Sequence, residues 1–309
     1  TLVTPNCGPS LGSHVVASPA SRAALEAAGL SVRSFVVPSC MPYSLGCMLI
    51  AVSVPNTAWE AADVVRNNRE PHLAMASTSR IMDAWGTVTS IAAVPGDIVE
   101  AGVYKGGTSM VMAWAELGVR KFREESARRH MWLFDTFEGL PPPSAKDGAR
   151  AHAKYANRNK QIPNDTDTKH AFDRGQPHID SRGIFRWNYG PLDLVQRNFF
   201  STGYPRHLTH FIKGKVEETL LSLQKSDELP KKIALLRLDT DFYESTRAEL
   251  AILYPRLVRG GILILDDYCT WSGARRAFDE FLEAHKRELN ITAGGRNRLC
   301  LKAIRTHLK

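Results

Sequence analysis

Two short stretches of the chain end in paired carboxylates, and these acids are the strongest candidates for chemistry. Residues 235–238 are mainly apolar and lead into Asp239 and Asp241, and residues 261–265 lead into Asp266 and Asp267. Each apolar run predicts a buried strand, so two neighbouring parallel strands would bring four carboxylates to one edge of a sheet. Negative charge at that density is costly unless it is compensated, which predicts a divalent cation held by oxygen ligands.

A structural role for single members of this group remains an alternative. An acid at the end of a strand often caps the following helix, and Asp241 or Glu244 could do so for a helix beginning at Ser245. Capping does not readily account for all four aspartates together. The cation site is therefore the better interpretation of the group.

A glycine-rich turn supplies a second candidate site. It contains Gly102, Gly106 and Gly107, and it joins a predicted strand to an apolar helix. Glycines let a ligand approach the backbone closely, and a helix N-terminus offers unpaired N–H groups. The spacing matches neither the dinucleotide fingerprint nor the P-loop. Because Asp135 ends the next predicted strand, where it suits ribose hydroxyls, the turn indicates a nucleoside ligand without pyrophosphate, and S-adenosylmethionine fits.

The elements that must position these residues alternate along the chain. Strands are predicted over residues 97–102, 130–134, 208–212, 233–238 and 262–265, with a closing hairpin over 291–304. Helices are predicted over 58–67, 77–92, 110–117, 192–200, 216–223, 245–257 and 273–289. This alternation predicts an α/β fold with a mostly parallel sheet, helices on both faces, and ligands at the carboxyl ends of the strands.

Composition excludes several classes of function. The net charge is +8, from 40 basic and 32 acidic residues, but the basic residues are scattered, so we expect no nucleic-acid partner. No apolar run approaches the roughly 18 residues that cross a bilayer, so no membrane partner is expected. The five cysteines include no CxxC pair, which favours free thiols in a reducing, cytoplasmic setting.

The N-terminal region differs from the rest. Residues 1–50 contain one acid, Glu26, and two basic residues, Arg22 and Arg33. We interpret residues 1–57 as an N-terminal arm or as a remnant of an organellar targeting segment. Residues 58–309 are predicted to form the main domain.

Six blocks in the same order make the chain resemble the macrocin O-methyltransferase family of metal-dependent sugar methyltransferases. They are residues 98–107, 134–141, 211–214, 235–246, 253–255 and 260–268. The resemblance extends over about residues 75–303. It implies a Rossmann-like class I methyltransferase fold with a mostly parallel seven-stranded sheet. It also implies S-adenosylmethionine as methyl donor, Mg²⁺, and a sugar hydroxyl as acceptor.

The resemblance also implies a role for each matching residue. The donor would be bound by Glu100, Gly102, Thr108, Ser109, Asp135, Phe137, Gly214 and Glu217. The metal would be bound by Asp239, Asp266 and Asp267. Asp241 would be the general base, on the same strand face as Asp239 by the period of two. Residues 144–190 match no block and are expected to form an acceptor lid, and Thr240 stands where the family commonly has a small residue such as Gly.

These features predict methyl transfer to a hydroxyl of a sugar or other vicinal diol in a glycosylated natural product. The expected partner is a small glycoside or diol, and assembly into a homo-oligomer is a further hypothesis. One alternative is another metal-dependent enzyme on the same fold, such as a hydroxylase or hydrolase, although no His lies beside Asp239 or Asp266 to form an iron site. The other is a non-catalytic binding protein, against which the intact glycine turn and the four aspartates argue.

Overall fold

The structure describes most of residues 58–309, the range predicted to form the main domain. A computed structural model describes residues 55, 57–67, 73–120, 129–158, 178–179, 185–293 and 301–306. The predicted arm, residues 1–57, lies almost wholly outside these residues. All described helices and strands belong to one unit, Asn56–Lys309. Among them, no helix combines the length and the apolar character that a membrane crossing requires.

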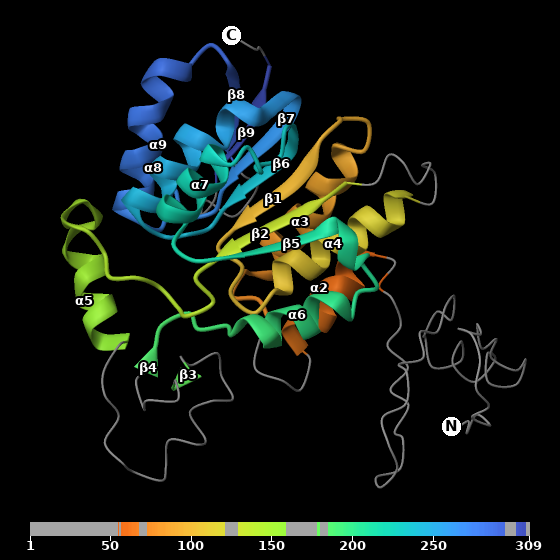
Figure 1. Cartoon of the computed structure of the whole chain (residues 1–309), viewed down its shortest axis with the longest axis horizontal. Coiled ribbons are helices and arrows are strands. Elements are labelled where there is room, and N and C mark those ends of the chain that lie inside the picture. Colours follow the sequence, from red (N-terminus) through yellow and green to blue (C-terminus); the bar gives the residue numbers. More distant parts are fainter. Residues whose placement is uncertain are drawn as a thin grey trace, which may run out of the picture. The chain divides into compact units, whose positions relative to one another are not determined.

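A seven-stranded sheet forms the centre of this unit (Figure 1). Its order is β5 (Thr209–Lys213), β2 (Met131–Asp135), β1 (Asp97–Ala101), β6 (Ile233–Leu238), β7 (Leu257–Leu265), β9 (Leu301–Arg305) and β8 (Leu289–Ala293). The first five strands are parallel, and β8 and β9 add the predicted antiparallel hairpin. The chain runs outward from β1 in one direction and from β6 in the other, so the switch point lies between these two strands.

Helices cover both faces of the sheet (Figure 1). One group comprises α2 (Ala58–Asn67), α3 (Thr78–Ser90), α4 (Gly107–Arg120) and α6 (Leu192–Phe200). The other comprises α7 (Val216–Lys225), α8 (Tyr243–Ile252) and α9 (Ser272–His285). The segment between β2 and α6 contains α5 (Gly148–Arg158) and a small antiparallel pair, β3 (His178–Ile179) and β4 (Phe185–Arg186).

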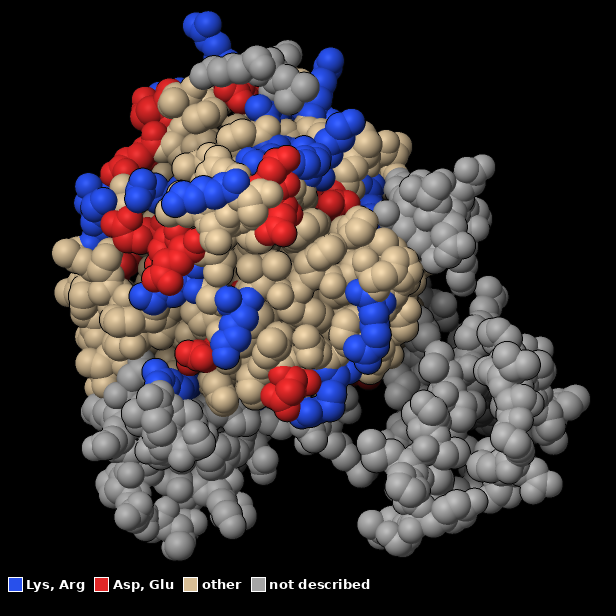
Figure 2. Space-filling model, viewed as in Figure 1, with Lys and Arg blue, Asp and Glu red and all other residues tan. Residues whose placement is uncertain are grey.

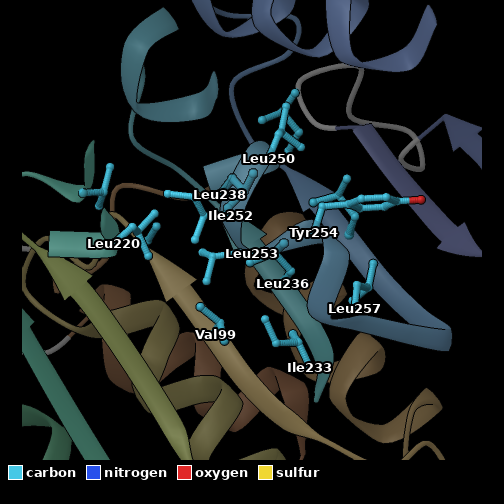
Figure 3. Packing of buried hydrophobic residues seen from close by; sticks show 14 of the residues in the cluster. Val99, Leu220, Ile233, Leu236, Leu238, Leu250, Ile252, Leu253, Tyr254 and Leu257 are labelled. Atoms are coloured by element: carbon cyan, nitrogen blue, oxygen red, sulfur yellow. The ribbon is translucent and has the colours of Figure 1, made fainter. Parts of the chain in front are cut away.

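Alternate residues of the central strands pack on opposite faces. Val99 and Leu236 join the apolar cluster that includes α7, α8 and α9 (Figure 3). Their neighbours Ile98 and Leu235 join the cluster that includes α3, α4 and α6. Because both faces are covered, a run such as residues 233–238 is apolar at nearly every position.

Three predicted boundaries are wrong by more than three residues, and one of them is the start of the strand predicted over 262–265, which lies at Leu257. The helix predicted over 245–257 runs from Tyr243 to Ile252, because Pro255 has no N–H to continue it; a 3₁₀ turn (Tyr254–Arg256) follows, and β7 begins at Leu257. The helix predicted over 273–289 ends at His285, and Leu289 opens β8.

The charged surface agrees with the scattered composition. On the face drawn in Figure 2, Lys and Arg side chains are interspersed with Asp and Glu rather than gathered in one stripe. Exposed ion pairs one helical turn apart occur among the described residues, such as Arg276 with Glu280 and Lys286 with Glu283. Such pairs contribute little to stability.

Candidate active site

A cavity lies at the carboxyl ends of β1, β2 and β6, beside the switch point. The glycine turn, the ends of β2 and β5 and the start of α7 contribute Gly102, Tyr104, Asp135, Thr136, Gly214, Lys215, Val216 and Glu217. The segments before α3, after β2 and after β4, together with the turn after β6 and the start of α8, contribute Met75, Gly139, Leu140, Pro141, Asn188, Asp239, Thr240, Asp241 and Ser245. The lining therefore includes the predicted residues Gly102, Asp135, Gly214, Glu217, Asp239 and Asp241. It does not include the predicted residues Glu100, Thr108, Ser109, Phe137, Asp266 and Asp267.

The turn between β1 and α4 requires glycine at its first position. Gly102 has a φ of 86°, and a Cβ atom there would lie 2.0 Å from the carbonyl oxygen of Asp239. Tyr104 in the same turn has a φ of 53°. The close approach at Gly102 holds the glycine turn against the end of β6, so the predicted donor side and the acidic side of the cavity are adjacent.

Asp135 organises the same turn. Its Oδ2 accepts the N–H groups of Val103 at 2.7 Å and Tyr104 at 3.0 Å, and its Oδ1 accepts that of Phe137 at 2.8 Å. Burial raises the pKa of Asp135, and these hydrogen bonds oppose the rise. The carboxylate thus ties β2 to the glycine turn while it lines the cavity. Its contact with a ribose hydroxyl stays a prediction.

Asp239, Asp266 and Asp267 come together at the ends of β6 and β7. One carboxylate oxygen of each lies within 4.8 Å of the others. The register explains this, since Leu238 pairs with Leu265 in parallel strands and the following residues meet at the same edge. The side chain of Asp239 is 29% exposed and that of Asp266 is 6% exposed, so the group is reached from the cavity through Asp239.

Arg237 is a buried cation that neutralises part of this group. It lies directly opposite Glu100 in the pairing of β6 with β1. Its Nη1 donates to Glu100 at 2.8 Å, and its Nη2 lies 2.9 Å from Asp239 and 3.2 Å from Asp266. Arg80 of α3 adds a second guanidinium 2.5 Å from Asp266.

Glu100 and Ser109, which were predicted to lie at the donor, belong to this buried network. The Ser109 hydroxyl donates to Glu100, and both residues are fully buried. Burial raises the pKa of Glu100, whereas the nearby guanidinium of Arg237 lowers it. Glu100 therefore connects to the acidic group through Arg237. Any role of Glu100, Ser109, Thr108 or Phe137 toward a donor stays a prediction.

Burial and mutual repulsion oppose the ionisation of the acidic group. Burial, with added repulsion from neighbouring carboxylates, raises the pKa of Asp239 and of Asp266 to about 6 and that of Asp241 to about 7. The same two causes raise the pKa of Asp267 strongly. Three clustered carboxyls whose ionisation is opposed in this way offer hard oxygen ligands, and a bound cation would favour their ionised form. The residues present therefore fit the predicted Mg²⁺.

Asp241 reaches the group by a turn, so the period-two argument for its position was wrong. β6 ends at Leu238, and Asp241 has a φ of 67°, which is outside the strand region. Its N–H donates to Oδ2 of Asp267 at 3.0 Å. Asp241 does not cap α8, because Asp147 does so.

Asp147 is a long-range cap that the sequence interpretation missed. Its Oδ1 accepts the N–H of Tyr243, the first residue of α8, at 2.6 Å, and its Oδ2 accepts the Ser144 N–H and hydroxyl at 2.7 and 2.8 Å. Ser272, the first residue of α9, donates its hydroxyl to the Asp147 carbonyl at 3.0 Å. The Ser144–Asp147 spacing is a readable capping box, but its attachment to α8 has no local signal.

An aromatic cluster joins α5 to the turn that carries Asp241. Trp187, Phe242 and Trp271 lie with ring centroids 5.7 to 6.3 Å apart. The ammonium group of Lys154, on α5, lies 5.3 Å from the Trp187 ring and 5.0 Å from the Trp271 ring. This charge lowers the pKa of Asp241, against the larger effect of burial.

Glu249 is a further buried acid beside the site, and its protonation state gives a testable prediction. It is fully buried, and the Thr240 hydroxyl donates to it at 3.0 Å. Burial raises its pKa from 4.5 to about 8. The unfolded chain ionises at lower pH than the folded chain, so this residue costs stability that grows as pH rises from about 4.5 and is complete above about 8.

We therefore expect Glu249→Gln to raise the free energy of unfolding relative to the wild type, increasingly as pH rises across that range. The gain should be about 1.4 kcal/mol for each pH unit by which the pKa of Glu249 in the folded protein exceeds that in the unfolded chain. Urea unfolding at about pH 5 and about pH 8 measures the difference. The exposed Glu218→Gln is the control. A Glu249→Gln difference that does not change with pH contradicts a protonated Glu249.

Sheet order, glycine turn and acidic group together define a Rossmann-like class I methyltransferase fold. The O-methyltransferase NovP has a solved structure that superimposes with a TM-score of 0.58 at 24% identity, over 80% of this chain and 88% of that one. A family model described as Macrocin-O-methyltransferase (TylF) matches residues 58–176 and 156–293. The chain belongs to this family.

Two curated relatives are similar over part of their length. One is the 8-demethyl-8-(2,3-dimethoxy-alpha-L-rhamnosyl)-tetracenomycin-C 4'-O-methyltransferase of Streptomyces olivaceus, 33% identical over 57% of this chain and 54% of that protein. The other is the mycinamicin III 3''-O-methyltransferase of Micromonospora griseorubida, 30% identical over 62% of each chain. The chain thus spans between half and two thirds of the length of these relatives.

Proposed function

We propose that the protein is an S-adenosylmethionine-dependent, Mg²⁺-dependent O-methyltransferase. Its acceptor would be a hydroxyl of a sugar, or of another vicinal diol, in a glycosylated natural product. The named activities of the two curated relatives, both O-methyltransferases, support this acceptor class. Residues 144–190 would form the acceptor lid, although residues 159–177 and 180–184 of this range lie outside the part of the chain that the structure describes.

One observation carries the proposal: a single cavity joins the two halves that the reaction needs. Gly102, Asp135, Gly214 and Glu217 line the same space as Asp239 and Asp241. A donor on the glycine side would therefore face an acceptor on the acidic side. Bringing two reactants into one oriented site supplies a large share of the rate.

The chemistry divides between the donor and this chain. S-adenosylmethionine would supply the methyl group on a sulfonium leaving group, and Mg²⁺ held by Asp239, Asp266 and Asp267 would bind the diol and acidify a hydroxyl. Asp241 would accept the hydroxyl proton as the oxygen bonds to the methyl carbon. Arg237 holds Asp239 and Asp266 in place.

The test is methyl transfer to a panel of simple glycosides, including rhamnosides, with the donor and Mg²⁺ present. We expect methylated glycoside by mass spectrometry, and donor binding by calorimetry. Donor binding without transfer to any diol argues for the non-catalytic interpretation. If the donor does not bind and no methyl group is transferred, the proposal as a whole is contradicted.

Metal removal is a separate prediction. Because the donor side is built from the glycine turn and the ends of β2 and β5, we expect chelation with EDTA to abolish turnover and to leave donor binding intact. Added Mg²⁺ should restore turnover and raise the unfolding midpoint, since a ligand that binds the folded state stabilises it. Full turnover after chelation and dialysis would contradict the proposed requirement for Mg²⁺.

A further inference from the structure

Strained backbone gathers around the cavity. Five described non-glycine residues have a positive φ: Tyr104, Phe137, Asn188, Asp227 and Asp241. Tyr104, Asn188 and Asp241 line the cavity. Such conformations cost free energy and persist where the surrounding structure imposes them, often at functional sites.

Two of these strained residues contact each other. Asn188, with a φ of 57°, donates its Nδ2 to Oδ2 of Asp241 at 3.4 Å. Asn188 follows β4, at the end of the proposed lid segment, and Asp241 follows β6. The contact therefore joins the proposed lid to the proposed base across 53 residues of sequence.

The position of Asn188 is fixed on both sides. Trp187, before it, is buried in the aromatic cluster with Phe242 and Trp271. Gly190, two residues later, packs so closely on the glycine turn that a Cβ atom would lie 2.1 Å from the Tyr104 carbonyl oxygen. The backbone on either side is thus anchored to the two halves of the cavity.

The chemistry of the pair sets the orientation of the amide. The amide nitrogen of Asn188 is the donor to the Asp241 carboxyl oxygen, and an amide also carries an oxygen that accepts hydrogen bonds. With its nitrogen committed to Asp241, Asn188 keeps an oxygen that can accept a hydrogen bond from a ligand in the cavity that it lines.

We propose that Asn188 is an acceptor-binding and positioning residue: its amide nitrogen orients the Asp241 carboxylate, and its amide oxygen accepts a hydrogen bond from a second hydroxyl of the diol. This rests on the proposed O-methyl transfer. If Asn188 has this role, a protein side chain contributes to the selection of a vicinal diol in addition to any bound metal. Asn188 also couples acceptor recognition to the orientation of the base.

The test uses variants that tolerate a positive φ. Asn188→Gly keeps the backbone conformation and removes both the amide nitrogen and the amide oxygen. Asn188→Asp keeps an accepting oxygen but loses the N–H group that donates to Asp241. The control is Asp227→Gly, at an exposed positive-φ position outside the cavity. Donor affinity by calorimetry should be unchanged in all three.

For the panel glycoside that the wild-type enzyme methylates, Asn188→Gly should raise the acceptor KM about 3- to 10-fold and also lower kcat. Asn188→Asp should also lower kcat, but it should raise the acceptor KM less than Asn188→Gly does. Calorimetric titration of the glycoside into the complex with demethylated donor should show the same ranking of affinity without turnover.

A monodeoxy analogue of that glycoside isolates the amide oxygen. The wild-type preference for the diol over the analogue should fall about 3- to 10-fold in Asn188→Gly. An unchanged preference, with wild-type methyl transfer intact, overturns the inference and leaves the proposed function standing. No transfer by the wild-type enzyme overturns both.

Discussion

Asp241→Asn should lose about 100- to 10,000-fold in kcat while donor and metal binding persist, because the substitution removes only the proton acceptor. Asn has the shape of Asp and tolerates the positive φ of this position. The Asp241 N–H to Asp267 contact, at 3.0 Å, uses the backbone and is retained. Steady-state kinetics give kcat, and calorimetry gives the two affinities.

Asp227→Asn is the matched control, since Asp227 also has a positive φ but lies on an exposed turn. It should keep full activity. An Asp241→Asn enzyme as active as this control rules out Asp241 as the base. In the wild type, turnover should fall as pH drops through the pKa of Asp241, which is about 7 without metal and lower once a cation is bound.

Arg237→Met should be the most destabilising single change at the site, by about 3 to 5 kcal/mol, because it removes the buried guanidinium that Glu100, Asp239 and Asp266 share. The guanidinium is 3% exposed and contacts Glu100, Asp239 and Asp266. Its loss raises the pKa of these acids further above their values in the unfolded chain. Stability then falls more steeply as pH rises, so the defect should be smaller at about pH 5 than at about pH 8.

Denaturant unfolding followed by circular dichroism, in EDTA, measures this loss. Lys231→Met is the control, because Lys231 and Asp227 form an exposed ion pair that contributes little. An Arg237→Met loss no larger than that of the control would contradict a structural role for the buried network.

The sequence predicted the sheet and the acidic group because both depend on local pattern. Residues 233–238 are apolar at every position except Arg237 because both faces of β6 are covered, and parallel register then brings Asp239, Asp266 and Asp267 to one edge. Arg237 interrupts that apolar run, and its partner Glu100 lies in the neighbouring strand, so this pair was open to prediction from the strand pattern.

Other contacts have no local signal. Arg80 reaches Asp266 across 186 residues, and Asn188 reaches Asp241 from a segment without a family block. The conformation of Asp241 also could not be predicted, since a period of two holds only while the strand continues. Thr240, which departs from the small residue expected, donates to Glu249, a partner nine residues away on α8.

Asp147 has a consequence for which residues of this protein can be exchanged. It anchors the starts of α8 and α9, and α8 begins two residues after Asp241. Gly148, immediately after it, has a φ of 77° and opens α5. Asp147 therefore fixes the start of α8, and Gly148 turns the chain away from this anchor into α5. We expect the exposed residues of α5, such as His152 and Ala153, to be exchangeable without moving the start of α8.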